Sequence, residues 1–268
     1  GFNQNTHRIA VGEPLGQFYG YITEGLYQVD DFNYDASTQT YTLKDGVSYH
    51  GDKGQIRPGM WKFKNLTGDD NVIDENDKTV IGNAQPKFYG GLNNSFTYKG
   101  FDLSIFLTFS YGNEVLNATK LVTSKVGSLN YNALDVMNSS NRWMTINSDG
   151  QKVTDPGELA ALNAGKTVAA YHDAQQGDNY IHSWAVEDAS YLKLSNVTLG
   201  YTFPKNLIAR VGLKNLRLYA TGNNLLTWTK YSGFDPEVST MKSGLTPGVD
   251  FGAYPLSRSF IFGLNVAF

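Results

Sequence analysis

The sequence predicts an all-β fold whose strands cross a membrane. Aromatic residues make up 13% of the 268 residues, charged residues only 18%, and 28 residues are glycine. This composition is typical of aromatic-rich strands joined by tight turns. Several segments alternate apolar and polar residues with period two. These segments run to roughly ten residues, the length that a tilted strand needs to cross hydrocarbon, whereas sandwich strands are usually about half as long.

The first two predicted strands begin near Phe88 and Phe101. One face of each strand is apolar: Phe88, Leu92, Phe96 and Tyr98 in the first, and Phe101, Leu103, Ile105, Leu107, Phe109 and Tyr111 in the second. The opposite faces carry mainly Gly, Ser, Thr and Asn, which suit a water-filled lumen and leave the apolar faces for lipid. We therefore expect the apolar face of the second strand to point outward.

Three further strands are predicted near Glu187, Leu213 and Arg258. Their apolar sets are Val197, Leu199, Tyr201 and Phe203; Leu216, Leu218 and Ala220; and Phe260, Phe262, Leu264, Val266 and Phe268. The alternation slips before Asn196, where Leu192 and Leu194 are apolar. A bulge near Ser195 explains this slip, or that half of the strand stands above the membrane; we favour the second explanation.

The connections predict an orientation and a division of the chain. Short connections at 98–100 and 204–211 alternate with long loops at 113–186 and 230–255, as periplasmic turns alternate with extracellular loops in outer-membrane barrels. Residues 1–85 are then a mainly extracellular region, and residues 86–268 hold the transmembrane strands. Five strands cannot close a barrel, and an open edge in lipid leaves backbone groups unsatisfied. We therefore expect the edge strands to pair with the rest of a larger barrel.

Composition excludes several function classes. A formal net charge of −3 lacks the basic surface that a nucleic-acid partner requires. The absence of cysteine excludes a disulfide scaffold, a thiolate zinc site and a cysteine nucleophile. The four histidines form neither a zinc pair spaced four residues apart nor part of a recognisable triad motif. No motif favours an enzyme.

The motifs at and between these strands resemble the C-terminal region of SusC/RagA-type TonB-dependent outer-membrane transporters of Bacteroidetes. They occur in family order: GEPLG (12–16), FYGY (18–21), GLY (25–27), PGMWKFK (58–64), VIGN (80–83), PKF (86–88), YKGFDLS (98–104), YGN (111–113), EDASYLKL (187–194), NVTLGY (196–201), LRLY (216–219), NNL (223–225) and GFDPE (233–237).

This resemblance implies a barrel of about 22 strands around an N-terminal plug. The plug and most of the barrel are not in this sequence. It also implies a bacterial outer-membrane location, a SusD-like surface lipoprotein as partner, energy from the TonB complex through the missing plug, and import of oligosaccharides or peptides. The long loops are expected to contribute to the surface that captures the substrate, because loops of this length are usually functional or disordered.

An acidic stretch at 68–77 resembles the calcium-type loop of many family members. Aligned to such a loop, Asp70, Asp74 and Asp77 fall at ligand positions. Leu66 and Gly68 occupy two positions where ligands are required, and Asn71 replaces the usual glycine. Because of these lost positions we favour an acidic surface turn without metal, and the alternative is that the three aspartates point into one turn that holds calcium weakly.

Aromatic residues in or beside the loops are the candidates for substrate contact. Sugar rings present C–H faces that stack on aromatic side chains. The candidates are Trp61, Tyr89, Trp143, Trp184, Trp228 and Tyr231. Each is equally explained as a loop-packing residue or a residue at the membrane interface. The Asp235-Pro236-Glu237 motif lies in the last long loop, where proline is expected to fix the loop's shape.

A second function from another class remains open, namely a soluble, secreted carbohydrate-binding or adhesin-like β-sandwich. The two readings differ in what covers the apolar faces, which must meet either lipid or a second sheet.

Overall fold

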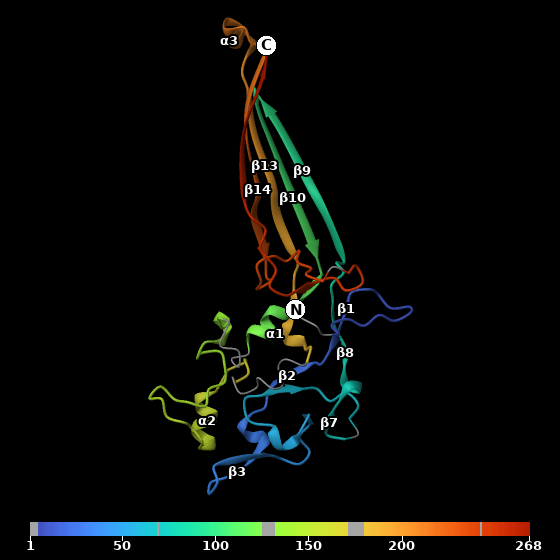
Figure 1. Ribbon diagram of the computed structural model, residues 1–268, viewed down its shortest axis with the longest axis vertical. Helices are drawn as coiled ribbons and strands as arrows, with labels where there is room; N and C mark the ends of the chain where they lie inside the picture. The colour runs from blue at the N-terminus through green and yellow to red at the C-terminus, as the bar shows by residue number, and fades with distance from the viewer. Residues whose placement is uncertain (1–4, 69, 125–131, 171–179, 242) are drawn as a thin grey trace.

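The computed structural model describes residues 5–68, 70–124, 132–170, 180–241 and 243–268. Its longest strands form a five-stranded sheet at one end of the molecule, and most of the remaining chain gathers at the other end (Figure 1). These strands are β9 (Phe88–Tyr98), β10 (Phe101–Tyr111), β13 (Tyr191–Thr202), β14 (Asn215–Thr229) and β16 (Ser259–Ala267). They pair antiparallel in chain order, which confirms the predicted consecutive series.

The predicted starts agree with the structure except at the third strand. β13 begins at Tyr191, and Glu187 lies in a separate short strand, β12 (Val186–Asp188). Between them Asp188 accepts a hydrogen bond from the Ser190 N–H at 2.9 Å. This local turn separates β12 from β13, which the sequence pattern had predicted as one strand. The Asp188 side chain gives the backbone N–H a hydrogen-bond partner that does not belong to a neighbouring strand.

The register places the apolar sets of the five strands on one face. Leu103 of β10 lies opposite Phe96 of β9 and Leu199 of β13, and Leu199 lies opposite Ala220 of β14. Ala220 in turn faces Phe262 of β16. Residues directly opposite in a ladder project to the same side, so the apolar face continues across the sheet. It is open in the described chain, with Phe96 58% and Phe262 80% exposed.

The slip in the alternation of β13 comes from a bulge. The register of β13 shifts between Leu194 and Asn196 against β14, and no ladder partner is assigned to Ser195 against either neighbouring strand. The preferred explanation, that this half of the strand stands above the membrane, was therefore wrong. One extra residue in a strand reverses the side to which all later side chains point, which restores the apolar face beyond Ser195.

The short and long connections lie at opposite ends of the sheet. The turn at Lys99-Gly100, the helix α3 (Lys205–Ile208) and the C-terminus lie at the upper end in Figure 1. The long segments that follow β10 and β14 leave from the lower end. We call the described residues of the segments 5–87, 112–190 and 230–258 the head.

The head is built from short strands that pair in small sheets. β1 (Gln17–Gly20) pairs with β8 (Thr79–Asn83), β2 (Thr23–Leu26) with β6 (Trp61–Phe63), and β3 (Phe32–Asp35) with β4 (Thr40–Leu43). β5 (Tyr49–His50) pairs with β7 (Val72–Ile73), and β11 (Glu114–Asn117) lies between β12 and β15 (Val249–Asp250). The described part of the head also contains the α-helices α1 (Ala118–Thr123) and α2 (Pro156–Leu162) and several single-turn 3-10 helices.

The core of the head joins segments that are far apart in the sequence. One buried cluster combines Tyr21 and Phe63 with Trp143 and Leu159. A second combines Phe18 with Leu116 and Val249. Residues 5–85 therefore share a core with both long loops, and burial of these side chains supplies the main free energy that holds the loops in place.

Among the described residues, no helix is both long and apolar enough to cross a bilayer.

Candidate functional site

The polar face of the sheet carries cross-strand hydrogen bonds between side chains. The Asn196 amide Nδ2 donates to Asn223 Oδ1 at 2.7 Å, and the hydroxyls of Thr198 and Thr221 lie 2.9 Å apart. The Ser104 hydroxyl donates to Asn93 Oδ1 at 3.2 Å. Amide and hydroxyl groups of this kind remain available to water or to a polar ligand, so the face is suited to line an aqueous lumen.

An ion pair crosses this face near the short connections. Arg217 donates from Nε to Asp102 Oδ1 at 3.0 Å and from Nη2 to Oδ2, which makes a bidentate pair. Gly200 lies on the strand between the two residues. A Cβ on Gly200 would come within 2.4 Å of Arg217 Nη2 and 2.5 Å of Asp102 Oδ1. The absence of a side chain at Gly200, the glycine of the NVTLGY motif, therefore leaves room for the Asp102–Arg217 ion pair, which links β10 to β14 across β13.

The last long loop is fastened to the head end of the polar face by the DPE motif. Glu237 accepts hydrogen bonds from the Lys193 ammonium and the Tyr191 hydroxyl. Lys193 is 5% exposed. Burial alone would raise the pKa of Glu237, but the hydrogen bonds from Lys193 and Tyr191 outweigh it and lower this pKa. The motif therefore fixes the loop to a strand.

The two long loops are tied together by one carboxylate. Glu187 Oε1 accepts from Lys120 Nζ at 3.0 Å and from the Ser232 hydroxyl at 2.9 Å, and Oε2 accepts from the Ser232 N–H at 2.9 Å. Burial alone would raise the pKa of Glu187, but the bonds from Ser232 and the charge of Lys120 lower it. The Lys120 ammonium also lies 4.1 Å from the centre of the Trp184 ring.

The structure brings two of the predicted aromatic residues together. The rings of Trp61 and Trp184 lie 5.0 Å apart, and the His182 ring lies 5.2 Å from Trp61. Trp61 is 4% exposed, and Trp184 is partly buried against the same core. In this arrangement the pair packs segment 61–63 against the end of the first long loop.

Trp143 and Tyr231 are also buried. Trp143 is 1% exposed and covers Gly59, whose absent Cβ would lie 2.3 Å from the ring. Gly59 has a φ of 87°, so the glycine of the PGMWKFK motif meets both a steric and a conformational requirement. Tyr231 is 5% exposed and donates to Asp250 Oδ2 at 2.7 Å. Burial and this bond raise the pKa of Tyr231.

The other two candidates lie on the sheet. Tyr89 is 78% exposed, pairs with Ser110 and lies on the polar face. Trp228 is 52% exposed and pairs with Leu192, on the same face as Phe109. A substrate-binding role for the six aromatic residues stays a prediction, and Tyr89 alone combines high exposure with the polar face.

The three aspartates of the acidic stretch do not converge. Asp77 is fully buried, with Oδ1 accepting from the N–H groups of Leu66 and Thr67 and Oδ2 from that of Asp74. Burial alone would raise the pKa of Asp77, but these bonds lower it.

Asp70 and Asp74 each accept a bond from an N–H two residues further on, Val72 and Asn76. No group of three or more acidic or histidine side chains that could hold a metal ion is present in the described ranges. Carboxylate oxygens of all three aspartates accept hydrogen bonds from backbone N–H groups of the same stretch. Calcium binding stays a prediction.

Sequence reasoning missed a pocket between β4, residues 55–60 and residues 145–159, and it missed the partners of Glu237 and Glu187. The pocket's cations, Arg57 and Lys152, stand in polar segments without a motif. Beyond the bulge in β13 the odd-numbered residues lie on the apolar face, and before it they lie on the polar face. A simple alternation therefore could not place Lys193 on the polar face.

Comparison with known proteins supplies relatives over most of the chain. A scan against models of known families gives no match. TonB-dependent receptor P3 of Formosa agariphila is 33% identical over 99% of this chain and 23% of its own length. TonB-dependent receptor SusC of Bacteroides thetaiotaomicron is 29% identical over 82% of this chain and 18% of its own length.

A solved structure described as the RagAB peptide transporter has the same fold. It superposes with a TM-score of 0.60 at 22% identity, covering 94% of this chain and 22% of the other. The chain spans less than a quarter of each of these three proteins. The sequence likenesses identify the chain as a relative of the SusC/RagA-type TonB-dependent receptors, and the structural likeness and the open five-stranded sheet show that it has the fold of the C-terminal part of such a barrel.

Proposed function

We propose that this chain is part of a TonB-dependent importer in the bacterial outer membrane that takes up oligosaccharides or peptides with a SusD-like surface lipoprotein. The observation that carries the proposal is the contrast between the two faces of the sheet. One face is apolar across all five strands, and the other carries hydrogen-bonded amides, hydroxyls and the Asp102–Arg217 pair. This is the arrangement of a barrel wall between lipid and an aqueous lumen.

The head supports a role in capture. Its segments share buried clusters, and the Glu187 and Glu237 contacts fasten the long loops to each other and to the sheet. A packed head at one end of the wall supplies a preformed surface for a substrate or a lid. Energy coupling belongs to the plug and the TonB complex, which lie outside this chain.

The soluble β-sandwich is not favoured by any observation. A sandwich covers the apolar face of one sheet with a second sheet. Within the described residues the only other sheets have two or three short strands, and they lie in the head. The apolar face keeps large exposed side chains such as Leu92 and Phe260, at 54% and 66%.

The test uses the complete transporter in its own bacterium. Cells are given fluorescently labelled oligosaccharides and peptides, and uptake is compared in the wild type, a strain without this transporter and a strain without TonB. A tagged transporter is purified in detergent, and the proteins that accompany it are identified by mass spectrometry. We expect loss of uptake in both deletion strains and a surface lipoprotein bound to the transporter.

A further variant tests the loops. Deleting 113–186 would remove Trp143 and Leu159 from the core, so we suggest replacing only the exposed turn 148–150 with glycine and serine. Reduced lid binding or uptake with normal barrel assembly is the expected result. Uptake that continues without TonB, together with a transporter that carries no lipoprotein, would disprove the proposal.

A further inference from the structure

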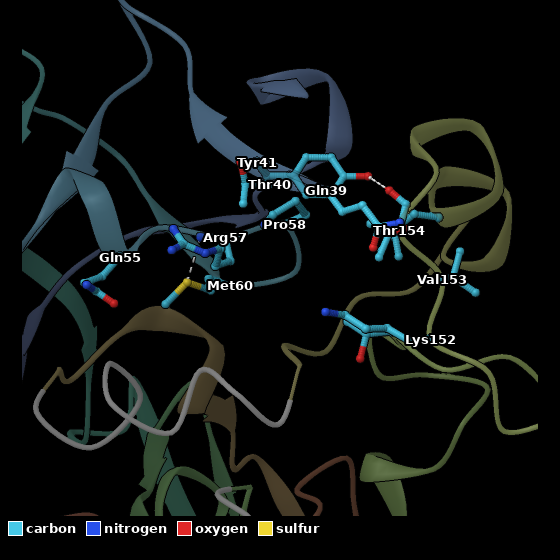
Figure 2. A pocket seen from close by; sticks show the side chains of 12 residues that line it. Gln39, Thr40, Tyr41, Gln55, Arg57, Pro58, Met60, Lys152, Val153 and Thr154 are labelled. Carbon is cyan, nitrogen blue, oxygen red and sulfur yellow. Dashed lines mark hydrogen bonds between the residues drawn. The ribbon is translucent and has the colours of Figure 1, made fainter. Parts of the chain in front are cut away.

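A half-open pocket lies in the part of the head that is farthest from the sheet. It has a volume of about 550 Å³, within the range of small-molecule sites. β4, the loop that ends at Met60, and the segment around Lys152 form its walls, as Figure 2 shows. The β3–β4 hairpin and α2 lie at the end of the head opposite the sheet in Figure 1.

The charged side chains that line the pocket are both cationic. They are Arg57 and Lys152, which Figure 2 shows on opposite walls. Both are exposed, and no carboxylate of the described residues forms a salt bridge with either. Arg57 Nη1 donates to the carbonyls of Gly54 and Ile56 at 2.7 Å, which holds the guanidinium at the edge of the pocket.

The acidic residue next to the lining in the sequence, Asp155, has its side chain in a helix cap. Asp155 follows the lining residue Thr154, and its Oδ1 accepts from the Glu158 N–H at 3.0 Å as the N-cap of α2. The Thr154 carbonyl accepts from the Tyr41 hydroxyl at 2.8 Å, which joins the two walls (Figure 2). The two walls of the pocket are therefore linked by a hydrogen bond, and no salt bridge within the described chain neutralises its two cationic groups.

The remaining lining is suited to a ligand that also has apolar and hydroxyl-bearing parts. Met60, Val153 and Leu159 contribute apolar surface, and Gln39 and Gln55 contribute amides. Guanidinium and ammonium groups bind a carboxylate through charge-assisted hydrogen bonds, which are stronger than neutral ones. Amides and apolar surface then hold the uncharged part of the ligand.

We propose that this pocket binds the carboxylate end of the captured ligand, through Arg57 and Lys152. The proposal deepens the proposed function and rests on it for the identity of the ligand. Two ligand classes carry this group, an oligosaccharide that ends in a uronic acid and a peptide with a free C-terminus.

The test measures binding to the purified complete transporter by calorimetry, so that it does not depend on uptake. The probes are trigalacturonate against neutral trigalactose, and trialanine against its C-terminal amide. The variants are Lys152→Gln alone and Lys152→Gln with Arg57→Gln. Lys64→Gln is the matched control, because Lys64 is an exposed cation of the head outside the pocket.

We expect one acidic probe to bind at least about tenfold more tightly than its neutral partner, as a charge-assisted hydrogen bond predicts. Lys152→Gln should weaken that binding, the double variant should remove the preference, and Lys64→Gln should leave it unchanged. The pair that shows the preference identifies the source of the carboxylate. Thermal unfolding of each variant checks that the head remains folded.

Equal binding of the acidic and neutral probes, absence of binding by all four, or a preference that survives in the folded double variant would overturn the pocket assignment. Uptake that still depends on TonB would then leave the proposed function standing. If the preference is present but uptake does not depend on TonB, the pocket assignment holds and the proposed function fails.

Discussion

Single carboxylates determine how parts of the head are held together. Asp77 is buried and accepts hydrogen bonds from the N–H groups of Leu66 and Thr67, and Glu237 accepts one from the ammonium of the buried Lys193. A buried donor left without a partner costs about 1–3 kcal/mol. These two carboxylates therefore stabilise the chain around them by pairing donors that water does not reach.

His182 should make the stability of the head depend on pH. It is fully buried, burial lowers its pKa to about 3 from 6.5, and its Nε2 has no hydrogen-bond partner among the described residues. The unfolded head gains a proton below pH 6.5, whereas the folded head does not until about pH 3. Stability is therefore present above pH 6.5 and is lost as the pH falls, by about 2 kcal/mol at pH 5.

Hydrogen exchange on the complete transporter measures this loss. The amides of Tyr21 and Ser183, which bond to Ile181 and Tyr21, report on opening around His182. Protection, corrected for the intrinsic rate, should fall between pH 7 and pH 5 in the wild type. His182→Gln should lack this dependence, and an equal fall in the variant would contradict the assignment to His182.

At the scale of elements, the bulge in β13 sets which side chains meet lipid. The hydroxyls of Thr108 and Ser195 lie 2.6 Å apart at the bulge, which gives the unpaired residue a side-chain partner. Without the extra residue, Leu192 and Leu194 would share a face with Asn196 and Thr198. The bulge therefore allows one strand to keep its apolar side toward lipid along its whole length.

Adjacent substitutions in β13 should have unequal effects. Leu199 is on the apolar face opposite Leu103, and Thr198 is on the polar face opposite Thr221. Leu199→Lys places a charge in hydrocarbon and should destabilise the assembled barrel by about 2–4 kcal/mol near the bilayer midplane. Thr198→Lys faces water and should cost much less.

The folded fraction of each variant in the complete transporter can be followed by the mobility shift of unheated samples in gel electrophoresis. A larger loss of folded protein in Thr198→Lys than in Leu199→Lys would reverse the assignment of the two faces.

At the scale of the whole molecule, the sheet is an open segment with two edges. β9 and β16 lie at its ends and have one described neighbour each. Each unpaired backbone group at an edge costs several kcal/mol in hydrocarbon. The sheet is therefore stable in a membrane when further strands of the same barrel cover both edges.

The 268 residues produced alone should not form a stable monomer. We expect aggregation without detergent because the apolar face and both edges lack partners. Size-exclusion chromatography with light scattering measures this, with the complete transporter in detergent as the control. A monodisperse, detergent-free monomer of the isolated chain would contradict the account of the edges.

The sequence by itself determined the strands and their faces. Period-two alternation over about ten residues reports directly which side of a strand is apolar, because successive side chains point to opposite sides. It therefore predicted the starts at Phe88 and Phe101 and the order of all five strands. Ordered motifs such as PGMWKFK and GFDPE indicated the family.

Only the tertiary structure decided what the loop residues do. Trp143 covers Gly59 and Lys193 meets Glu237 across long stretches of sequence, and the pocket joins Arg57 to Lys152. Such contacts have no local period, because they depend on how separate segments share one core. The same reason explains why Trp61 and Trp143, singled out as candidates for contact with substrate, lie in the core of the head. The residue pattern of a strand shows which of its side chains meet lipid and which meet water, whereas the surroundings of a loop residue depend on segments that are distant in the sequence.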